Sequence, residues 1–396
     1  MLMMRMLVKH IRKFMPVGHG AFFIERLILE GRRVLTAVYD CGDSNSGHEV
    51  EKNALQEFGT ADDEGREKVD MLFISHLDDD HVNGLTYLQP YLKQNTRVFL
   101  PFYYGNMRNV YDKNKRDGIT TVVSILNQIG IKPILVQYAG TDVQGDGIDI
   151  DEYDYEAANH TIYSGQPITK IIQGQPIWRY VPFNLFNEQN LYQEFQNKVQ
   201  NSLHWSNAKL SDAAHWSQQE IKALRGIYNS LTGTTINDNS LIVLSDKPKG
   251  HRLGRYDTIH ADFLQHPRTC LCFRWDGCCG ISCLYTGDTV LRRGVRKTSK
   301  YVDRYEDFIK NLQQHVEFIS LMQIPHHGSS TNSNIASLCD CMSGRLFCNY
   351  ATADSQKVIS ILNRTKLESV WKNVYSITED AKTMFEEIGY YWTNRI

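Results

Sequence analysis

The sequence predicts an α/β protein, a layered arrangement of sheets and helices, and two observations support this class. Short apolar segments of strand length alternate with segments of helix length through the N-terminal part of the chain. Histidine and acidic residues gather directly after several apolar segments, as they do where strands deliver site residues to one edge of a sheet. The 396 residues, 42% of them hydrophobic and 22% charged, are sufficient for a large core in an ordinary globular protein.

The N-terminal region predicts three strands joined by turns that contain glycine. The strands are expected at Leu7–Phe14, Ala21–Leu29 and Val34–Tyr39, with Gly18 and Gly20 in the first turn. Apolar residues alternate only in part along these segments. Such partial alternation is typical of strands that are buried on both faces.

Helices and strands alternate in the next part of the chain. We expect helices at 50–66, Gly84–Lys93 and Val122–Ile129, and strands at Val69–Ile74, Val98–Leu100 and Ile134–Tyr138. This order favours an α/β domain in which helices cover the sheet.

The rest of the chain predicts further strands and two insertions, within a single domain that spans residues 1–396. The stretch 140–165 is acidic and loop-like. The first insertion, 183–236, is rich in Asn and Gln and has helical spacing, and the second, 246–268, is a polar, basic loop. The remaining elements are strands at Ile168–Ile172, Ile177–Val181, Leu241–Leu244, Cys270–Trp275, Ile281–Tyr285, Glu317–Ile324, Arg345–Phe347 and Val374–Ile377, and a helix at Gln356–Asn363.

Charge and composition narrow the classes of partner. The formal net charge of −2 means that a nucleic acid would need a local basic patch. No apolar run approaches the ~18 residues of a membrane span, so no membrane partner is expected. Four basic residues interrupt the N-terminal stretch MLMMRMLVKHIRKF, which favours a strand over a signal peptide. Without such a signal, the nine cysteines favour free thiols, and we expect a cytoplasmic protein.

The most informative segment follows the strand expected at Val69–Ile74 and reads H-x-D-x-D-H. Its four ligand-type residues are His76, Asp78, Asp80 and His81. Such a cluster at the end of a buried strand is costly to desolvate unless a divalent cation neutralises it. The alternative is that the carboxylates cap the N-terminus of a helix.

Two later segments offer further ligands at strand ends. Asp288 follows the strand that ends at Tyr285, and the pair His326 and His327 follows Ile324. The three segments together supply about six ligands, enough for two metal ions ~3.5–4 Å apart that share a carboxylate or hydroxide. Taken alone, a His pair more often has a structural role than a metal-binding one. Here the other two segments favour metal binding instead.

In combination these motifs resemble the metallo-β-lactamase fold and, within it, the hydrolase domain of the DNA-uptake channel protein ComEC and its free-standing relatives. Most lactamase-fold enzymes carry H-x-H-x-D-H, whereas the ComEC-like branch has Asp at the second His position, as Asp78 here. The other matches, which keep the family order, are Val17-Gly18-His19-Gly20 for a VGQG-like turn, Asp40-Cys41-Gly42 for Asp-x-Gly, Asn237-Asp238-Asn239-Ser240 for Asn-Asn-Ser, Thr286-Gly287-Asp288 for T-G-D and His326–Ser329 for H-H-G-S.

The chain departs from the family pattern at two places. Pro16 and Ala21 replace the acidic residues that usually flank the VGQG-like turn. The late G-H-P-S motif is replaced by Ala353-Asp354-Ser355, so its His has no counterpart there, and whether Asp354 takes its place is open.

The resemblance implies an αββα sandwich that binds two divalent metal ions, Zn²⁺ or Mn²⁺. If the ligand roles of the family are assigned to the matching positions here, one ion would be bound by His76 and Asp78 and the other by Asp80 and His81. Asp288 would bridge the two ions, and His326 or His327 would complete the coordination shell. Asp78 in place of a His makes the site harder, so Mn²⁺ is as plausible as Zn²⁺.

The same assignment of family roles gives supporting residues and a reaction. Asp40, Asn239 and Ser329 would orient ligands from outside the coordination shell. The implied reaction is hydrolysis by a metal-bound hydroxide, with Asp80 and Asp288 as the catalytic residues.

The basic run after Asp288 bears on the substrate. Its residues are Arg292, Arg293, Arg296 and Lys297. They would bind phosphate groups if they reach the site, or would otherwise form only a solvated face. The sequence therefore predicts a phosphodiesterase, foremost a nuclease that acts on DNA. One alternative is a hydrolase of a small phosphoester or signalling nucleotide. The other is a lactamase-fold interaction protein or regulated effector, with weak or suppressed catalytic activity and a regulatory protein partner.

Overall fold

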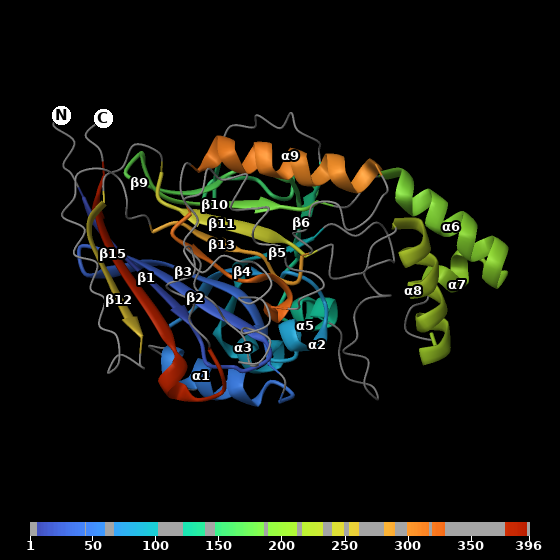
Figure 1. Ribbon diagram of the computed structural model, residues 1–396, viewed down its shortest axis with the longest axis horizontal. Coiled ribbons are helices and arrows are strands. Elements are labelled where there is room, and N and C mark those ends of the chain that lie inside the picture. The colour runs from blue at the N-terminus through green and yellow to red at the C-terminus, as the bar shows by residue number, and fades with distance from the viewer. Residues whose placement is uncertain are drawn as a thin grey trace, which may run out of the picture.

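The protein has a mixed α/β fold with two β-sheets, in agreement with the predicted class (Figure 1). The computed structural model describes residues 6–43, 45–59, 67–101, 122–138, 147–185, 189–211, 216–232, 240–248, 253–260, 281–289, 299–316, 319–328 and 377–393. Within these ranges, no helix is long and apolar enough to cross a membrane.

The larger sheet has nine strands in the order β12-β15-β1-β2-β3-β4-β5-β6-β8. Its strands are β1 (Leu7–Phe14), β2 (Ala21–Leu29), β3 (Arg32–Gly42), β4 (Val69–Phe73), β5 (Leu92–Pro101), β6 (Ile134–Gln137), β8 (Thr161–Tyr163), β12 (Leu253–His260) and β15 (Phe385–Trp392). Neighbours are antiparallel from β12 to β3 and parallel from β3 to β8. The three predicted N-terminal strands are thus confirmed.

The smaller sheet has six strands in the order β14-β13-β11-β10-β9-β7. They are β7 (Ile148–Asp149), β9 (Ile168–Ile172), β10 (Gln175–Phe183), β11 (Ile242–Asp246), β13 (Cys283–Tyr285) and β14 (Leu321–Met322). The strands expected at Ile168–Ile172 and Ile177–Val181 are confirmed as the antiparallel pair β9 and β10. The β13–β14 pair is parallel.

Helices cover the outer faces of the two sheets (Figure 1). The helices are α1 (His48–Phe58), α2 (Asp79–Val82), α3 (Leu85–Leu88), α5 (Val122–Gln128), α6 (Gln189–Leu203), α7 (Asn207–Ser211), α8 (Gln218–Thr232) and α9 (Ser299–His315), with 3-10 segments η1 (Gln89–Tyr91), η4 (Pro325–Gly328) and η5 (Ala381–Thr383). Of these, α6, α7 and α8 lie beyond one end of the sheets (Figure 1). On the smaller sheet, α9 packs its Phe308 edge-on against Phe183 of β10. The helical prediction for the first insertion is confirmed by α6, α7 and α8.

Both faces of the central strands are buried, in separate cores. In β2, Phe23 and Leu27 belong to a core shared with residues of the smaller sheet, such as Trp178. Phe22 and Ile24 of the same strand belong to a second core with α1, α3 and α5. The strand alternates between two cores, which explains why its apolar pattern is nearly continuous.

Several predicted boundaries were wrong. The stretch 140–165 contains β7 and β8, and the second insertion contains β12, which forms the edge of the larger sheet next to β15. The helix expected at Gly84–Lys93 ends early, since Pro90 lies in η1 and β5 begins at Leu92. The elements expected at 270–275, 345–347 and 356–363, and most of 374–377, lie outside the described residues.

Candidate metal centre

Strands from both sheets end at one edge and carry the predicted site residues there. β3 and β4 are parallel, so Asp40 and the segment after Phe73 lie at the same end of the larger sheet. In the smaller sheet, Asp288 follows β13, which is parallel to β14. The backbone N–H of Leu241, just before β11, donates to the carbonyl oxygen of Ser75 at 2.8 Å. This hydrogen bond joins the two sheets beside the site.

Asp288 lies among four imidazoles, with one carboxylate oxygen toward each pair. Its Oδ2 is 3.8 Å from Nε2 of His76 and 3.6 Å from Nδ1 of His326. Its Oδ1 is 3.2 Å from Nε2 of His81 and 3.6 Å from Nε2 of His327. Two ligands of a tetrahedral ion with bonds of about 2.1 Å lie about 3.4 Å apart. The spacing therefore fits a carboxylate that is shared by two ions.

The two inner imidazoles leave a buried nitrogen that a metal ion would satisfy. His76 and His81 are fully buried, and Nε2 of each makes no hydrogen bond within the described part of the chain. An unsatisfied buried polar group costs about 1–3 kcal/mol. With Asp288 the two residues form a group whose ligand atoms lie within 4.8 Å of one another. This imidazole and carboxylate donor set fits Zn²⁺ or Mn²⁺.

Burial and neighbouring charges shift the pKa values of these ligands. Burial alone would raise the pKa of Asp288, but the imidazoles of His81 and His327 hold it well below its usual range. Burial opposes a charge on His81, yet the carboxylates of Asp288 and Asp40 raise its pKa well above the ordinary value. Burial and the adjacent His81 lower the pKa of His76. A proton on His81 therefore competes with any metal ion at that nitrogen.

Asp40 holds the far edge of the His81 ring. Its Oδ2 is 2.8 Å from Nδ1 of His81, and its carboxylate accepts hydrogen bonds from the backbone N–H and the hydroxyl of Ser75 at 2.6 and 2.7 Å. The backbone of Asp40 is in the left-handed region, with φ of 55°. Such a conformation at a residue other than glycine costs on the order of 1–3 kcal/mol and concentrates at functional sites. Asp40 thus lies where it can orient the imidazole, the role expected of it.

Two serines contact the Nδ1 edge of the His76 ring. The hydroxyl oxygens of Ser75 and Ser240 are 3.0 and 3.3 Å from Nδ1 of His76. The hydroxyl of Ser240 also accepts a hydrogen bond from the backbone N–H of Asp288 at 3.1 Å. Sequence reasoning missed both serines, although Ser240 directly follows the predicted Asn239.

A glutamine and a glycine shape the turn that carries Asp288. The side-chain oxygen of Gln323 accepts hydrogen bonds from the backbone N–H groups of Thr286 and Gly287, both at 3.0 Å. Gly287 has a φ of +52°, and a Cβ atom there would lie 2.7 Å from Cβ of Ser75. Both the backbone conformation and the packing therefore require glycine at this position.

The two rings of the histidine pair lie near different carboxylate oxygens of Asp288, His326 near Oδ2 and His327 near Oδ1. His326 and His327 have φ values of 51° and 46°, an uncommon conformation for two successive residues with side chains. The backbone N–H of His326 donates to the carbonyl oxygen of Gly287 at 3.1 Å. The expectation was that one of the two histidines would serve the site, and the structure brings both to it.

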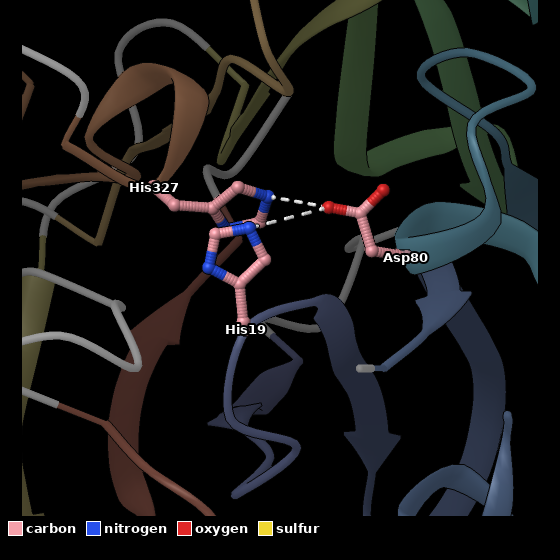
Figure 2. Close-up of side chains that lie close together, drawn as sticks. All are labelled: His19, Asp80 and His327. Atoms are coloured by element: carbon pink, nitrogen blue, oxygen red, sulfur yellow. Dashed lines mark ion pairs between the residues drawn. The ribbon is translucent and has the colours of Figure 1, made fainter. Parts of the chain in front are cut away.

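A second group of ligand-type atoms consists of His19, Asp80 and His327 (Figure 2). Oδ2 of Asp80 is 3.1 Å from Nε2 of His327 and 3.7 Å from Nε2 of His19. Burial acts to raise the pKa of Asp80, but the imidazoles of His81 and His327 hold it below its usual range. His19 was not a predicted ligand, and its one signal was a His at the Gln position of the VGQG-like turn.

Both groups contain members of the H-x-D-x-D-H run, and the expected pair of Asp80 and His81 also lies close, with Oδ2 of Asp80 3.9 Å from Nε2 of His81. His76 and His81 belong to one group and Asp80 to the other. Oδ2 of Asp78 is 4.0 Å from Nε2 of His76, so it lies beside the first group. Asp78 occupies the position before α2, but its side chain makes no capping hydrogen bond. Helix capping is therefore not the role of this carboxylate.

The other predicted site residues lie outside the described part of the chain. They are Asn239, Ser329, Arg292, Arg293, Arg296 and Lys297. Asp354, the residue at the place of the late His, lies outside it as well.

Comparison of the chain with protein-family models gives no match, and comparison with curated proteins gives none either.

Proposed function

We propose that the chain is a two-metal hydrolase with an αββα sandwich of the metallo-β-lactamase type, in its ComEC-like branch, and that the ions are Zn²⁺ or Mn²⁺. The observation that carries the proposal is Asp288, whose two carboxylate oxygens each face a pair of imidazole nitrogens at 3.2 to 3.8 Å. Helices on the outer faces of two sheets support the fold assignment (Figure 1).

The described residues have separate tasks in this chemistry. Two bound ions would supply an activated water and would offset the charge that develops at a phosphorus or carbonyl centre. Asp80 and Asp288 act as ionised ligands, since neighbouring imidazoles hold the pKa of each carboxyl below its usual range. His76 and His81 lie on the buried side, and Asp80, 26% exposed, lies on the side that a substrate can reach.

We infer that the substrate is a phosphodiester, foremost DNA. Asp78, whose Oδ2 is 4.0 Å from Nε2 of His76, would add an oxygen ligand where most lactamase-fold enzymes have an imidazole, and a harder site favours ions that prefer oxygen, such as Mn²⁺. The basic run Arg292, Arg293, Arg296 and Lys297 follows Asp288 closely in the sequence and would contact the phosphate backbone.

A degradation assay tests this proposal. Wild-type protein is incubated with single- and double-stranded DNA in Mn²⁺ or Zn²⁺, beside Asp80→Ala and Asp288→Ala. Asp151→Ala, a change at an exposed carboxylate outside the site, serves as the matched control. We expect metal-dependent cleavage by wild type and control and its loss in both site variants. Equal activity in all four proteins would overturn the proposal.

A small phosphodiester in the same assay separates the two substrate classes. Cleavage of a small chromogenic phosphodiester without cleavage of DNA would retain the metal-dependent hydrolase and reject DNA as its substrate. The same site variants must abolish that activity, because both reactions use the same ligands.

A further inference from the structure

The connection between β1 and β2 brings a histidine to the candidate metal centre, and we propose that His19 is a metal ligand there. The ion that it binds would be shared with Asp80 and His327 (Figure 2). The inference rests on the proposed function, because it places an ion at that centre. It adds a ligand that lies outside the H-x-D-x-D-H, T-G-D and H-H-G-S motifs.

The backbone holds His19 at the tip of a tight turn. The N–H of Gly20 donates to the carbonyl oxygen of Gly18 at 2.9 Å, across His19. Gly18 has a φ of +68°, a conformation that favours glycine. A Cβ atom at Gly20 would lie 2.3 Å from the carbonyl oxygen of Gly42. The turn therefore packs directly against the end of β3, with no side chain between them.

The same end of β3 also supports Asp80. A Cβ atom at Gly42 would lie 2.3 Å from the carbonyl carbon of Asp80 and 2.4 Å from the backbone nitrogen of His81. The turn of His19 and the segment of Asp80 thus both pack against Gly42 at the end of β3. Backbone contacts, rather than long flexible side chains, fix the separation of the two residues.

The side-chain geometry fits shared coordination better than a hydrogen bond. The 3.7 Å between Nε2 of His19 and Oδ2 of Asp80 exceeds hydrogen-bonding distance. It is close to the separation of about 3.4 Å between two ligands of one ion. The rings of His19 and His327 lie with centroids 4.2 Å apart, and Nε2 of His327 is 3.6 Å from Oδ1 of Asp288. An ion here would therefore adjoin the bridging carboxylate.

The donor types and their exposure indicate the kind of ion. Two imidazoles and a carboxylate suit Zn²⁺, Mn²⁺ or Co²⁺ rather than Ca²⁺ or Mg²⁺, which prefer oxygen ligands. The side chain of His19 is 39% exposed, whereas those of His76 and His81 are fully buried. Solvent can thus reach the ion that His19 binds.

Calorimetric titration of the full chain, freed of metal by a chelator, with Zn²⁺ provides the first test. We expect the wild type to bind two ions, and His19→Ala to bind one of them with unchanged affinity and the other more than about tenfold more weakly. His48→Ala is the matched control, since His48 is an exposed histidine of α1 that pairs with Glu51. The control should bind both ions as the wild type does.

A cysteine at this position gives a direct signature of ligation. Thiolates are good ligands for these ions, and a thiolate bound to Co²⁺ gives a charge-transfer absorption. We expect His19→Cys loaded with Co²⁺ to show this absorption above the level of wild type, and His19→Ala to show no such increase. A histidine that only packs on His327 would not produce this difference.

The outcomes separate this inference from the proposed function. Two ions with wild-type affinity in His19→Ala, together with no new absorption in His19→Cys, would overturn the role of His19 and leave a two-metal hydrolase intact. A wild-type protein that binds no divalent ion would overturn both.

Discussion

The carboxylate of Asp40 lies 2.8 Å from Nδ1 of His81 and leaves Nε2 of that ring directed at Asp288. Loss of such a partner typically lowers metal affinity 10- to 100-fold, roughly, because the ligand ring loses its orientation and basicity. We therefore expect Asp40→Asn to weaken Zn²⁺ binding by about this factor in competition with a chromophoric chelator. Asp151→Asn is the control, and equal affinity in wild type and Asp40→Asn would contradict the assigned role.

Gly42 tests whether backbone packing positions the ligands. A Cβ atom at this position would lie 2.3 Å from backbone atoms of Asp80, which cannot move as a side-chain tip can. Gly42→Ala should lower the free energy of unfolding by about 1–3 kcal/mol and reduce the metal content. Gly226→Ala in α8 is the control, because a Cβ atom there meets nothing within 4 Å. Unchanged stability and metal content in Gly42→Ala would contradict the packing argument.

A buried ion-pair network joins the two sheets away from the metal centre. Arg12 is fully buried and donates to Glu25 at 2.6 Å and to Glu387, while the hydroxyl of Tyr285 donates to Glu25 at 2.7 Å. Removal of one partner from a buried pair typically costs about 3–5 kcal/mol. We expect Glu25→Gln to lower the free energy of unfolding by about this amount in denaturant titration.

An exposed ion pair gives the comparison for that network. The side chains of Lys132 and Glu156 are 65% and 70% exposed, so solvent screens their interaction. Glu156→Gln should leave the denaturation midpoint unchanged. An equally small effect of Glu25→Gln would show that the buried network does not stabilise the fold.

The same network predicts how stability depends on pH. Burial acts to raise the pKa of Glu25, but Arg12 holds it far below its usual value of 4.5, so its stabilisation is lost as the pH falls below that value. Burial and Arg12 lower the pKa of His10 from 6.5, so the unfolded state takes up a proton first and stability again falls with pH. We expect the thermal midpoint to decrease from about pH 7 to about pH 4.

Glu25→Gln isolates that pH dependence. The thermal midpoint of the variant should fall less steeply than that of wild type from about pH 4.5 to about pH 3, where the wild type loses the stabilisation from Glu25. His81 of the metal-free protein contributes with the opposite sign, since its raised pKa adds stability below about pH 6.5, and the comparison of two proteins removes this contribution. Parallel pH profiles would contradict the role assigned to Glu25.

Strands with a strong local pattern were predictable from the sequence, and strands stabilised by distant partners were not. The buried strands β1, β2 and β3 have apolar segments bounded by glycine. In contrast, β15 contains Glu386 and Glu387, which read as surface residues. Glu387 is in fact fully buried against Arg12, and Glu386 lies 3.2 Å from Lys13. These contacts span nearly the whole chain, so no local pattern reveals them.

The candidate site was predictable to a similar extent. Polar residues near the ends of apolar strands indicated Asp80 and Asp288, because strand ends converge at one sheet edge, and the family resemblance added Asp40. His19 was missed because its approach depends on two glycine contacts between backbones, and a turn sequence does not show where the turn packs. The division of His326 and His327 between the two sides depends on left-handed backbone angles at both residues.

The metal content of the purified protein tests the central claim most directly. Elemental analysis of wild type beside Asp288→Asn measures whether the carboxylate between the four imidazoles holds divalent ions. We predict two ions of Zn²⁺ or Mn²⁺ per wild-type chain and a clear loss in Asp288→Asn, with the folded state of both verified by thermal unfolding. A wild-type protein without bound divalent metal after loading, or a variant that retains both ions, would contradict the account.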